Sequence, residues 1–327
     1  MPNDQDDDFE VLSFKVTAKD LADHKRLDSW LSQKIPELSR SLIKKLFEQG
    51  SVSSDSDIKI ELKKMPPEGT IINFEVPPPK DVNITPENIP LEILFEDENL
   101  LIINKEAGMV VHPAPGNYTG TLVNAVLYHC PNLKGIGNEK RPGIVHRLDK
   151  GTSGIMVVAK SQKCHEKLVE IFQRHDIDRK YEAIILGTRF ELEQTIESNI
   201  GRSPYNRLKM STNSKNGKHA ITHFKTLNIF KNFSHVELKL ETGRTHQIRV
   251  HLSEILNCPI LNDSLYGREK EEQYFLTSEM KSILKNYEYP FLHAKILGFT
   301  HPITGEKLYF EKEPPEIFQK VLNSLKS

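Results

Sequence analysis

The sequence predicts an α+β protein of two domains, in which a small N-terminal α/β domain precedes a larger domain with a mixed, largely antiparallel sheet and flanking helices. Three observations lead to this prediction. The chain has 327 residues, more than one average domain holds. Three consecutive prolines at 77–79 interrupt it, and prolines favour an extended, linker-like backbone. Beyond them, short apolar stretches typical of strands are interspersed with helical segments, without the regular alternation of a parallel α/β fold.

We expect four segments along the chain: an acidic flexible tail and lead-in at 1–19, the small domain at 20–76, a proline-rich linker at 77–90 and the larger domain at 91–327. Residues 1–10 contain five acidic residues and no basic one, a composition typical of a solvated tail. The formal net charge of the whole chain is −1, so the remainder of the chain is net positive. A near-neutral total therefore does not exclude a polyanionic partner.

The small domain is expected to hold two helices and a closing strand at 70–76. Residues 26–31 have the amphipathic pattern of a short helix. A second helix is predicted to begin at Ser39, a favourable N-cap, and to end before Gly50. In it, apolar residues recur at helical spacing and basic residues occupy the opposite face: Leu42, Ile43, Leu46 and Phe47 against Arg40, Lys44 and Lys45.

In the larger domain, apolar runs rich in β-branched residues predict strands, and amphipathic stretches predict helices. Segment 236–240 alternates apolar and polar residues, which predicts a strand with one face in water. The expected strands are 100–103, 144–145, 155–159, 181–186 and 236–240, and the expected helices are 119–129, 162–175 and 245–256.

The composition excludes several classes of protein. Hydrophobic residues make up 37% of the chain and charged residues 27%, so the chain can form a core and is not disordered throughout. No stretch approaches the roughly 18 apolar residues of a spanning helix, which excludes an integral membrane protein, and the acidic start lacks the pattern of a signal peptide. Three widely spaced cysteines favour a reducing, cytoplasmic setting over a disulfide framework or a thiolate zinc site. We expect a monomer.

The densest group of reactive side chains lies at 141–154, where a loop containing Asp149 joins two apolar segments. Loops on a rigid sheet often carry functional carboxylates. The alternative is that Asp149 only makes an Asx-turn, a common use of Asp between strands. Its basic neighbours His146, Arg147 and Lys150 favour the functional interpretation, since they would keep the carboxylate ionised for nucleophilic attack or for contact with a polyanion.

A second group lies at 241–252, next to the alternating strand. His246, Arg249 and Ser253 are spaced so that a helix would place them on one face. The alternative is an ordinary solvated face. Two arginines, Arg244 and Arg249, beside a glycine turn at a helix start are better suited to bind phosphate or carboxylate groups. The histidines of the two groups have no local metal-ligand spacing, so we expect no metal.

Three short segments carry little information by themselves. Tyr181 follows Arg179 and Lys180 at the start of a predicted strand, where tyrosine is most often a half-buried packing residue. Residues 104–105 and 112–113 are interpreted as turn or loop elements without obvious chemistry.

Taken together, these segments resemble the motifs of the RluA-type pseudouridine synthases. The N-terminal part, from Arg26 through Ser41, resembles the small RNA-binding domain of the ribosomal-protein S-four type, and this architecture is nearest to the subgroup that acts on large-subunit ribosomal RNA. The resemblance covers nearly the whole chain after residue 20. The motif residues follow in the family's order: 104–105 with 112–113, 146–150 with 152–154, 180–183, 242–251, 259–260, Asp263 and 266–267.

The resemblance implies isomerisation of uridine to pseudouridine in RNA, in which the base is detached at N1, turned and rejoined through C5. It implies that Asp149 is the nucleophile, attacking base or sugar or assisting a glycal route. Tyr181 would stack on the target base and is a candidate for the base that removes a proton. Arg249 would pair with Asp149, and Arg147 would hold the displaced nucleotide's place. No cofactor or metal is implied.

The expected partner is RNA, most specifically large-subunit (23S) ribosomal RNA, and no membrane. Loop 201–219 carries several basic residues suited to backbone contact, although it is also interpretable as a disordered surface excursion. The residues expected to contact RNA are Arg147, His146, Arg244, His246, Arg40, Lys44 and Lys45.

The sequence departs from the family pattern at a few positions. Gly151 stands where an acidic residue is usual, Glu106 where proline is common and Asn262 where glycine is common. In the small domain, 52–55 lacks the usual Val-Asn-Gly turn. None of these changes involves Asp149, Tyr181 or Arg249.

Two rival functions are consistent with parts of the pattern. The first is a catalytically inactive RNA-binding or ribosome-assembly factor, against which the complete set of Asp149, Tyr181 and Arg249 argues. The second is phosphoryl transfer, because 149–152 partly matches the phosphorylation loop of transport ATPases. Glycine and threonine stand in the wrong order for that loop, and no downstream magnesium-binding acidic motif follows.

Overall fold

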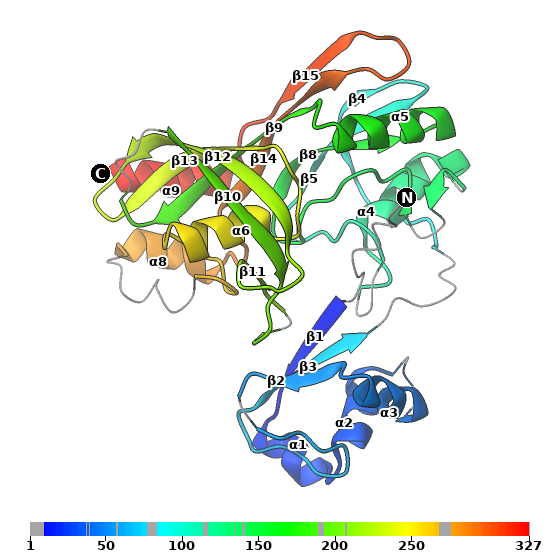
Figure 1. The fold of residues 1–327 in the computed structure, drawn as a ribbon, viewed down its shortest axis with the longest axis vertical. Helices are drawn as coiled ribbons and strands as arrows, with labels where there is room; N and C mark the ends of the chain where they lie inside the picture. The colour runs from blue at the N-terminus through cyan, green and yellow to red at the C-terminus, as the bar shows by residue number, and fades with distance from the viewer. Residues whose placement is uncertain are drawn as a thin grey trace. The chain divides into compact units, whose positions relative to one another are not determined.

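The structure is a computed structural model that describes residues 10–36, 38, 40–56, 58–76, 84–113, 117–133, 135–138, 141–188, 193–206, 208–267 and 276–326. The chain divides into two compact units (Figure 1). The first comprises residues 1–83, 114–118 and 204–208, and the second comprises the rest of 84–327.

The first unit is a three-stranded antiparallel sheet with short helices, in the strand order β1-β3-β2. Its core is shared by two helices and the central strand, through Leu27, Trp30, Leu31, Ile43, Leu46, Ile72 and Phe74. The elements are β1 (Glu10–Lys15), α1 (Ala18–Asp23), α2 (Leu27–Lys34), α3 (Arg40–Glu48), β2 (Val52–Ser54) and β3 (Ile71–Val76).

The two predicted helices and the closing strand of this unit are confirmed as α2, α3 and β3. The expected lead-in up to residue 19 is wrong, because β1 pairs with β3 along its whole length. Leu12 and Phe14 alternate with polar residues and pack against the core of this unit, the pattern of a strand with one buried face. Residues 1–9 and the predicted N-cap Ser39 lie outside the described residues.

The second unit is built on a ten-stranded sheet in the order β11-β10-β12-β13-β9-β14-β8-β5-β4, with β15 paired to β14. Neighbouring strands are antiparallel except β14 and β8, so the predicted mixed, largely antiparallel α+β fold is confirmed. The strands are β4 (Glu92–Glu96), β5 (Leu100–Lys105), β8 (Ser153–Ala159), β9 (Asp178–Leu186), β10 (Glu193–Arg202), β11 (Met210–Ser211), β12 (Lys218–Ile229), β13 (Phe233–Leu240), β14 (Leu292–Thr300) and β15 (Lys307–Glu311).

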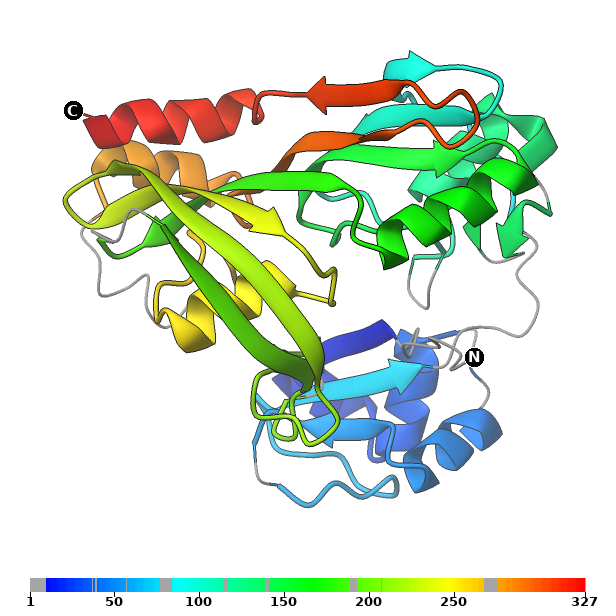
Figure 2. The ribbon, with the colours of Figure 1, turned by 45° about the horizontal axis from the view of Figure 1, so that its top comes forward.

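Helices pack on this sheet at both of its halves. One half has a core of β5, β8 and β14 residues against which α5 packs, and at the other half α8 and α9 lie side by side (Figure 2). No helix among the described residues is both long and apolar enough to cross a membrane. The helical elements are α4 (Leu122–His129), the 3₁₀ turn Pro131–Leu133, α5 (Gln162–Gln173), α6 (Gln247–Val250), the π-helical turn His251–Ile255, α8 (Ser278–Lys285) and α9 (Glu316–Lys326).

Two predictions for this unit are wrong. Segment 144–145 is not a strand: Ile144 makes only an isolated bridge to Val158, because the chain there runs along the edge of β8 without continuing the ladder. Residues 84–90 are not linker, since Ile84 is buried and the backbone of Thr85 accepts a hydrogen bond from a side chain of α4. Residues 77–83 lie outside the described residues.

Candidate active site

Asp149 lies in the loop between the short hairpin β6 (Gly137–Asn138) and β7 (Arg141–Pro142) and strand β8. Its own carbonyl accepts a hydrogen bond from the backbone N–H of Thr152 at 3.0 Å. The carbonyl of the next residue, Lys150, accepts one from the backbone N–H of Gly108 at 2.7 Å and lies 3.5 Å from the Lys105 Nζ. The loop is therefore held from two sides by backbone contacts next to the carboxylate.

His146 fastens the same loop to the edge of β8. Its Nε2 accepts a hydrogen bond from the backbone N–H of Val157 at 3.0 Å, and its ring stacks on Phe172 of α5 at 4.7 Å. Burial, aided by the nearby Arg179, lowers the pKa of His146 to about 3, so the ring is neutral at pH 7. The expectation that His146 adds positive charge beside Asp149 is therefore wrong.

Gly154 lets three strands approach one another below the loop. Its φ is +123°, and a Cβ there would lie 2.3 Å from the carbonyl oxygen of Ala294. Ala294 pairs with Gly154 on one side and with Tyr181 of β9 on the other. Adjacent strands are about 4.8 Å apart, so this register places Tyr181 roughly 10 Å across the sheet from the end of the Asp149 loop.

Tyr181 is buried, with 8% of its surface exposed. Burial raises the pKa of its phenol, the negative charge of Asp149 raises it further, and Arg179 opposes both effects. The phenol is therefore neutral at pH 7, and the charges of both Asp149 and Arg179 affect its pKa.

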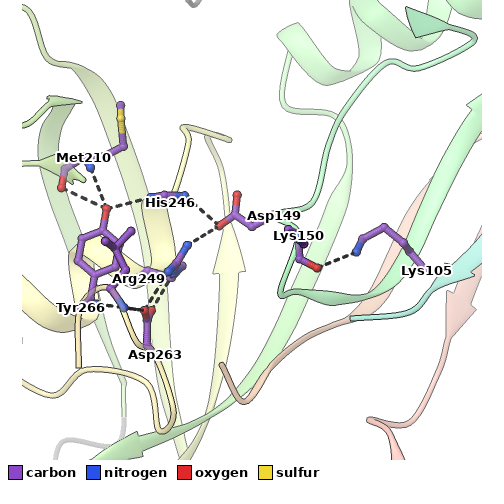
Figure 3. A network of polar contacts seen from close by, with 9 residues as sticks. Lys105, Asp149, Lys150, Met210, His246, Arg249, Asp263 and Tyr266 are labelled. Atoms are coloured by element: carbon purple, nitrogen blue, oxygen red, sulfur yellow. Dashed lines mark hydrogen bonds and ion pairs between the residues drawn. The ribbon is translucent and has the colours of Figure 1, made fainter. Parts of the chain in front are cut away.

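Arg249 extends from the short helix α6 towards Asp149. Its Nη1 lies 3.4 Å from Asp149 Oδ2, but its strongest partner is Asp263, which accepts from Nε at 2.7 Å and from Nη2 at 2.8 Å (Figure 3). The Asp263 side chain is fully buried and also accepts from the backbone N–H groups of Leu265 and Tyr266. Two parallel hydrogen bonds to a fixed carboxylate orient the guanidinium before any substrate binds.

A second polar path reaches Asp149 through His246 and Tyr266 (Figure 3). The backbone N–H of Met210 donates to the Tyr266 hydroxyl at 2.8 Å, and that hydroxyl lies 2.9 Å from His246 Nδ1. His246 Nε2 lies 3.9 Å from Asp149 Oδ2. Burial lowers the pKa of His246 to about 4. A neutral ring carries one hydrogen, either on Nδ1 towards the Tyr266 hydroxyl or on Nε2 towards the carboxylate.

These neighbours decide the ionisation of Asp149, whose side chain is 20% exposed. Burial alone would raise the pKa of the carboxyl, but His246, Arg249 and the exposed Arg147 outweigh it and lower the pKa below its usual value. Asp149 is therefore a carboxylate at neutral pH, partly accessible and unable to reorient freely. Such a group can act as a nucleophile.

The three residues predicted to share a helical face do lie together, because all three contact the segment around Tyr266, but only Arg249 belongs to α6: His246 precedes the helix and Ser253 lies in the π-helical turn after it. His246 contacts the Tyr266 hydroxyl, Arg249 lies over the Tyr266 ring at 5.0 Å, and Ser253 donates to the Tyr266 carbonyl. His246 has φ of +54°, a strained conformation for a residue other than glycine, and a π-helical turn follows α6. Both features are frequent at functional sites.

Gln247 anchors α6 to β12. Its amide nitrogen donates to the Ile221 carbonyl and to Thr222 Oγ1, both at 2.9 Å, and its oxygen accepts from Thr242 at 2.8 Å. Nearby, Arg244 Nε donates to the carbonyl of His219 on the same strand. The motif at 242–251 therefore supplies both the site residues and the contacts that position them.

Lys105, Asp263 and Tyr266 are site residues to which the sequence patterns assigned no role. Lys105 is 1% exposed at the end of β5, and its Nζ donates to the carbonyls of Glu106 at 2.8 Å and Met109 at 2.9 Å. Burial lowers the pKa of Lys105 to about 7, with Asp149 and Glu106 opposing that shift. The prediction that residues 104–105 form a turn without chemistry is thus wrong, since both belong to β5.

The remaining sequence candidates lie in the first unit, on α3. Arg40 is half exposed and pairs with Asp28 at 3.1 Å, a carboxylate that Arg26 also binds at 2.7 Å. Lys44 and Lys45 are exposed. The predicted basic face of this helix is therefore accessible, although Arg40 pairs with Asp28 and Lys44 lies 3.9 Å from Glu48.

Among the residues that the structure describes, one group of side chains has donor atoms close enough for a metal ion: Glu96, His129 and Cys130, all within 4.8 Å of one another. It belongs to β4 and the end of α4, not to the Asp149 loop. The Lys160 ammonium lies 2.6 Å from Glu96 Oε1 and would compete with a cation there.

Residues 99–254 match the family model described as RNA pseudouridylate synthase. The ribosomal large subunit pseudouridine synthase D of Zymomonas mobilis is 43% identical over 307 residues, covering 92% of this chain and 93% of that protein. An uncharacterized RNA pseudouridine synthase of Aquifex aeolicus is 39% identical over 97% of both chains. The solved structure of human RNA pseudouridylate synthase domain containing 4 covers 72% of this chain and 93% of its own, with 28% identity and a TM-score of 0.56. The chain thus belongs to the RNA pseudouridine synthases of the RluA type, which are enzymes that act on RNA.

Proposed function

We propose that this enzyme converts specific uridines of large-subunit (23S) ribosomal RNA to pseudouridine. Several similar proteins, from Zymomonas mobilis and Vibrio vulnificus among others, are named ribosomal large subunit pseudouridine synthase D, which supports the ribosomal substrate. The exposed basic residues of α3 and the exposed Arg147 beside Asp149 are suited to a polyanionic ligand. A ribosomal substrate would place the enzyme in the cytoplasm.

In this proposal Asp149 is the nucleophile, and the observation that carries it is the ionised, partly accessible carboxylate held by Arg249 and His246. During the reaction the bond from N1 to the ribose C1′ breaks, the base turns, and a bond forms between C5 and C1′. C5 loses a proton and N1 gains one, so the product is an isomer of the substrate. Attack at the base, attack at the sugar and a glycal route all require a carboxylate in this place.

The other site residues orient that carboxylate or bind the flipped base. A target base must leave its stack, which costs a few kcal/mol, and an aromatic platform offsets part of that cost. Tyr181 provides the platform and removes the C5 proton. Arg249, oriented by Asp263, keeps Asp149 ionised, and Arg147 occupies the place that the base leaves.

The RNA contacts fall into two groups. Arg147 and His246 lie beside Asp149, Arg244 precedes α6 and contacts β12, and Arg40, Lys44 and Lys45 lie on α3 of the small, S-four-type unit. We assign backbone contacts to the arginines and lysines, so binding should weaken as salt rises. His146, whose ring nitrogen is engaged by Val157, contributes by positioning the loop.

The test of the catalytic role uses Asp149→Asn, which removes the charge and keeps the size. The purified variant should bind RNA with an affinity close to that of the wild type and form no pseudouridine. Equal pseudouridine formation by Asp149→Asn and the wild type would overturn the catalytic role of Asp149, and no formation by either protein would leave an RNA-binding factor.

The test of the substrate is pseudouridine mapping of ribosomal RNA from a strain that lacks this gene. One or more uridines of the large-subunit RNA should lose their modification, and the gene for the wild-type protein should restore it. If every ribosomal pseudouridine persists, the substrate is another RNA.

A further inference from the structure

Arg179 is a buried cation that the site described above leaves without a function. It precedes Tyr181 by two residues in β9, so both side chains emerge on the same face of the sheet. Only 7% of its surface is exposed. Its Nη2 donates to the carbonyl of Glu241 at 2.8 Å, and its guanidinium lies over the Phe172 ring at 5.4 Å.

No carboxylate among the described residues forms an ion pair with Arg179, and its Nε is a buried donor without a hydrogen-bond partner there. A buried charge without a counter-ion is destabilising, and one carbonyl and one aromatic ring offset that cost only in part. Such a charge is stabilising only where negative charge develops near it. The ionisable group with the largest electrostatic effect on the pKa of Arg179 is the Tyr181 phenol.

The other surroundings of Tyr181 do not supply this charge. Its partners on the neighbouring strands, Leu238 of β13 and Ala294 of β14, are neutral. Asp149, from the loop, is negative and disfavours a phenolate. Arg179 is therefore the cation whose position lowers the free energy needed to ionise Tyr181.

We propose that Arg179 is a positioning residue that stabilises negative charge on the Tyr181 oxygen, so that Tyr181 removes the C5 proton as a phenolate. The inference rests on the role proposed above for Tyr181. The phenol first releases its proton to water. The phenolate oxygen then takes the proton from C5, the electron pair of that C–H bond restores the double bond of the ring, and water returns a proton to N1.

The experiment compares three full-length variants with the wild type. Arg179→Gln removes the charge but can still donate to the Glu241 carbonyl, and Arg179→Lys keeps the charge. Lys180→Gln is the matched control, because Lys180 is also a cation next to Tyr181 but points to the opposite face and pairs with Glu237.

The first readout needs no turnover: NMR of tyrosines labelled at the phenolic carbon, with Tyr181→Phe identifying the Tyr181 signal. Its titration should move to higher pH in Arg179→Gln and stay in place in Arg179→Lys and Lys180→Gln. The second readout is the single-turnover rate constant for pseudouridine formation. It should fall about tenfold in Arg179→Gln at neutral pH, with little change in RNA affinity, and recover in Arg179→Lys.

If the Tyr181 titration is the same in Arg179→Gln and the wild type, or if Arg179→Lys is as slow as Arg179→Gln, Arg179 only supports the loop at Glu241 and the inference is wrong. A failure of the proposed function looks different, because Asp149→Asn would then remain active while the Tyr181 titration still responded to Arg179.

Discussion

Arg249 binds Asp263 through two hydrogen bonds of 2.7 and 2.8 Å, whereas its contact with Asp149 is a single one of 3.4 Å. The orientation of the guanidinium is thus set by a fully buried carboxylate outside the reaction and not by the proposed nucleophile. This division of roles leads to the first prediction.

Asp263→Asn should destabilise the protein and slow the reaction. Removing one partner of a buried ion pair leaves the other charge uncompensated, which costs about 3–5 kcal/mol in the free energy of unfolding. A misplaced Arg249 should lower the rate of pseudouridine formation about a hundredfold. Urea denaturation and single-turnover assays measure the two effects. The control is Asp178→Asn, whose pair with Lys239 is partly exposed and should contribute less than about 1 kcal/mol. Full activity in Asp263→Asn would contradict the positioning role.

Lys105→Met should loosen the Asp149 loop. The change leaves the carbonyls of Glu106 and Met109 without their donor, at a cost of about 1–3 kcal/mol for each unsatisfied group. The variant no longer buries a charged ammonium group, and this gain offsets part of the cost of the unsatisfied carbonyls. We therefore expect a net loss of about 2 kcal/mol in the free energy of unfolding. The reaction should slow about tenfold because the neighbouring Lys150 carbonyl also loses a contact. Lys281→Met, at an exposed position of α8, is the control and should change neither quantity.

Stability should fall as the pH drops from about 6.5 to about 4. Burial lowers the pKa of His251 from 6.5 to about 4, and the pKa values of His112, His246 and His293 fall to about the same value. Between these limits the unfolded chain binds more protons than the native one, so stability rises with pH. At pH 5 each such histidine lowers the free energy of unfolding by about 2 kcal/mol relative to pH 7.

His251→Gln tests the predicted loss of stability at low pH, since glutamine can replace a hydrogen bond to Thr222 or Ser198 but does not titrate. The difference in unfolding free energy between pH 7 and pH 5 should shrink by about 2 kcal/mol in this variant. His219→Gln, at a side chain that is 53% exposed, is the matched control for replacing a histidine by glutamine. The same pH dependence in both variants would show that buried His251 is not responsible.

Gly154→Ala should be far more damaging than a glycine substitution at a surface turn. Its Cβ would lie 2.3 Å from a backbone oxygen of β14, which cannot move without breaking the pairing of three strands, so the cost should be roughly 4 kcal/mol or more. Gly305→Ala has a comparable positive φ of +79° with open space around it, and should cost only about 1 kcal/mol. Thermal unfolding of the two variants makes the comparison. Similar melting temperatures would mean that the strand contact at Gly154 is not tight.

Local patterns predicted most of the elements. The runs at 100–103, 155–159, 181–186 and 236–240 all fall within strands, because apolar β-branched sequences are suited to a buried sheet wherever it forms. The run at 144–145 has the same composition but no partner strand, and only one bridge forms. Strand pairing is a property of two segments, so composition alone could not distinguish these cases.

The site was predictable to the extent that its motifs are local. Asn262 has one feature that the local sequence indicates and one that only the tertiary structure reveals. It replaces a common glycine of the family, and the structure gives it a φ of +63°, a conformation that asparagine tolerates better than most residues. Its side chain also donates to the carbonyl of Tyr289, a contact that no neighbouring residue in the chain indicates.

By itself the sequence determined the class of fold, the family and the identity of the reactive residues, because helical period, proline runs and motif residues are all local properties. Only the tertiary structure decided which charges meet. It paired Arg249 with Asp263, made His146 a neutral support of the loop and left Arg179 buried without a carboxylate partner among the described residues. Coulomb energies and desolvation depend on distance in space and on burial, and neither quantity can be read from spacing along the chain.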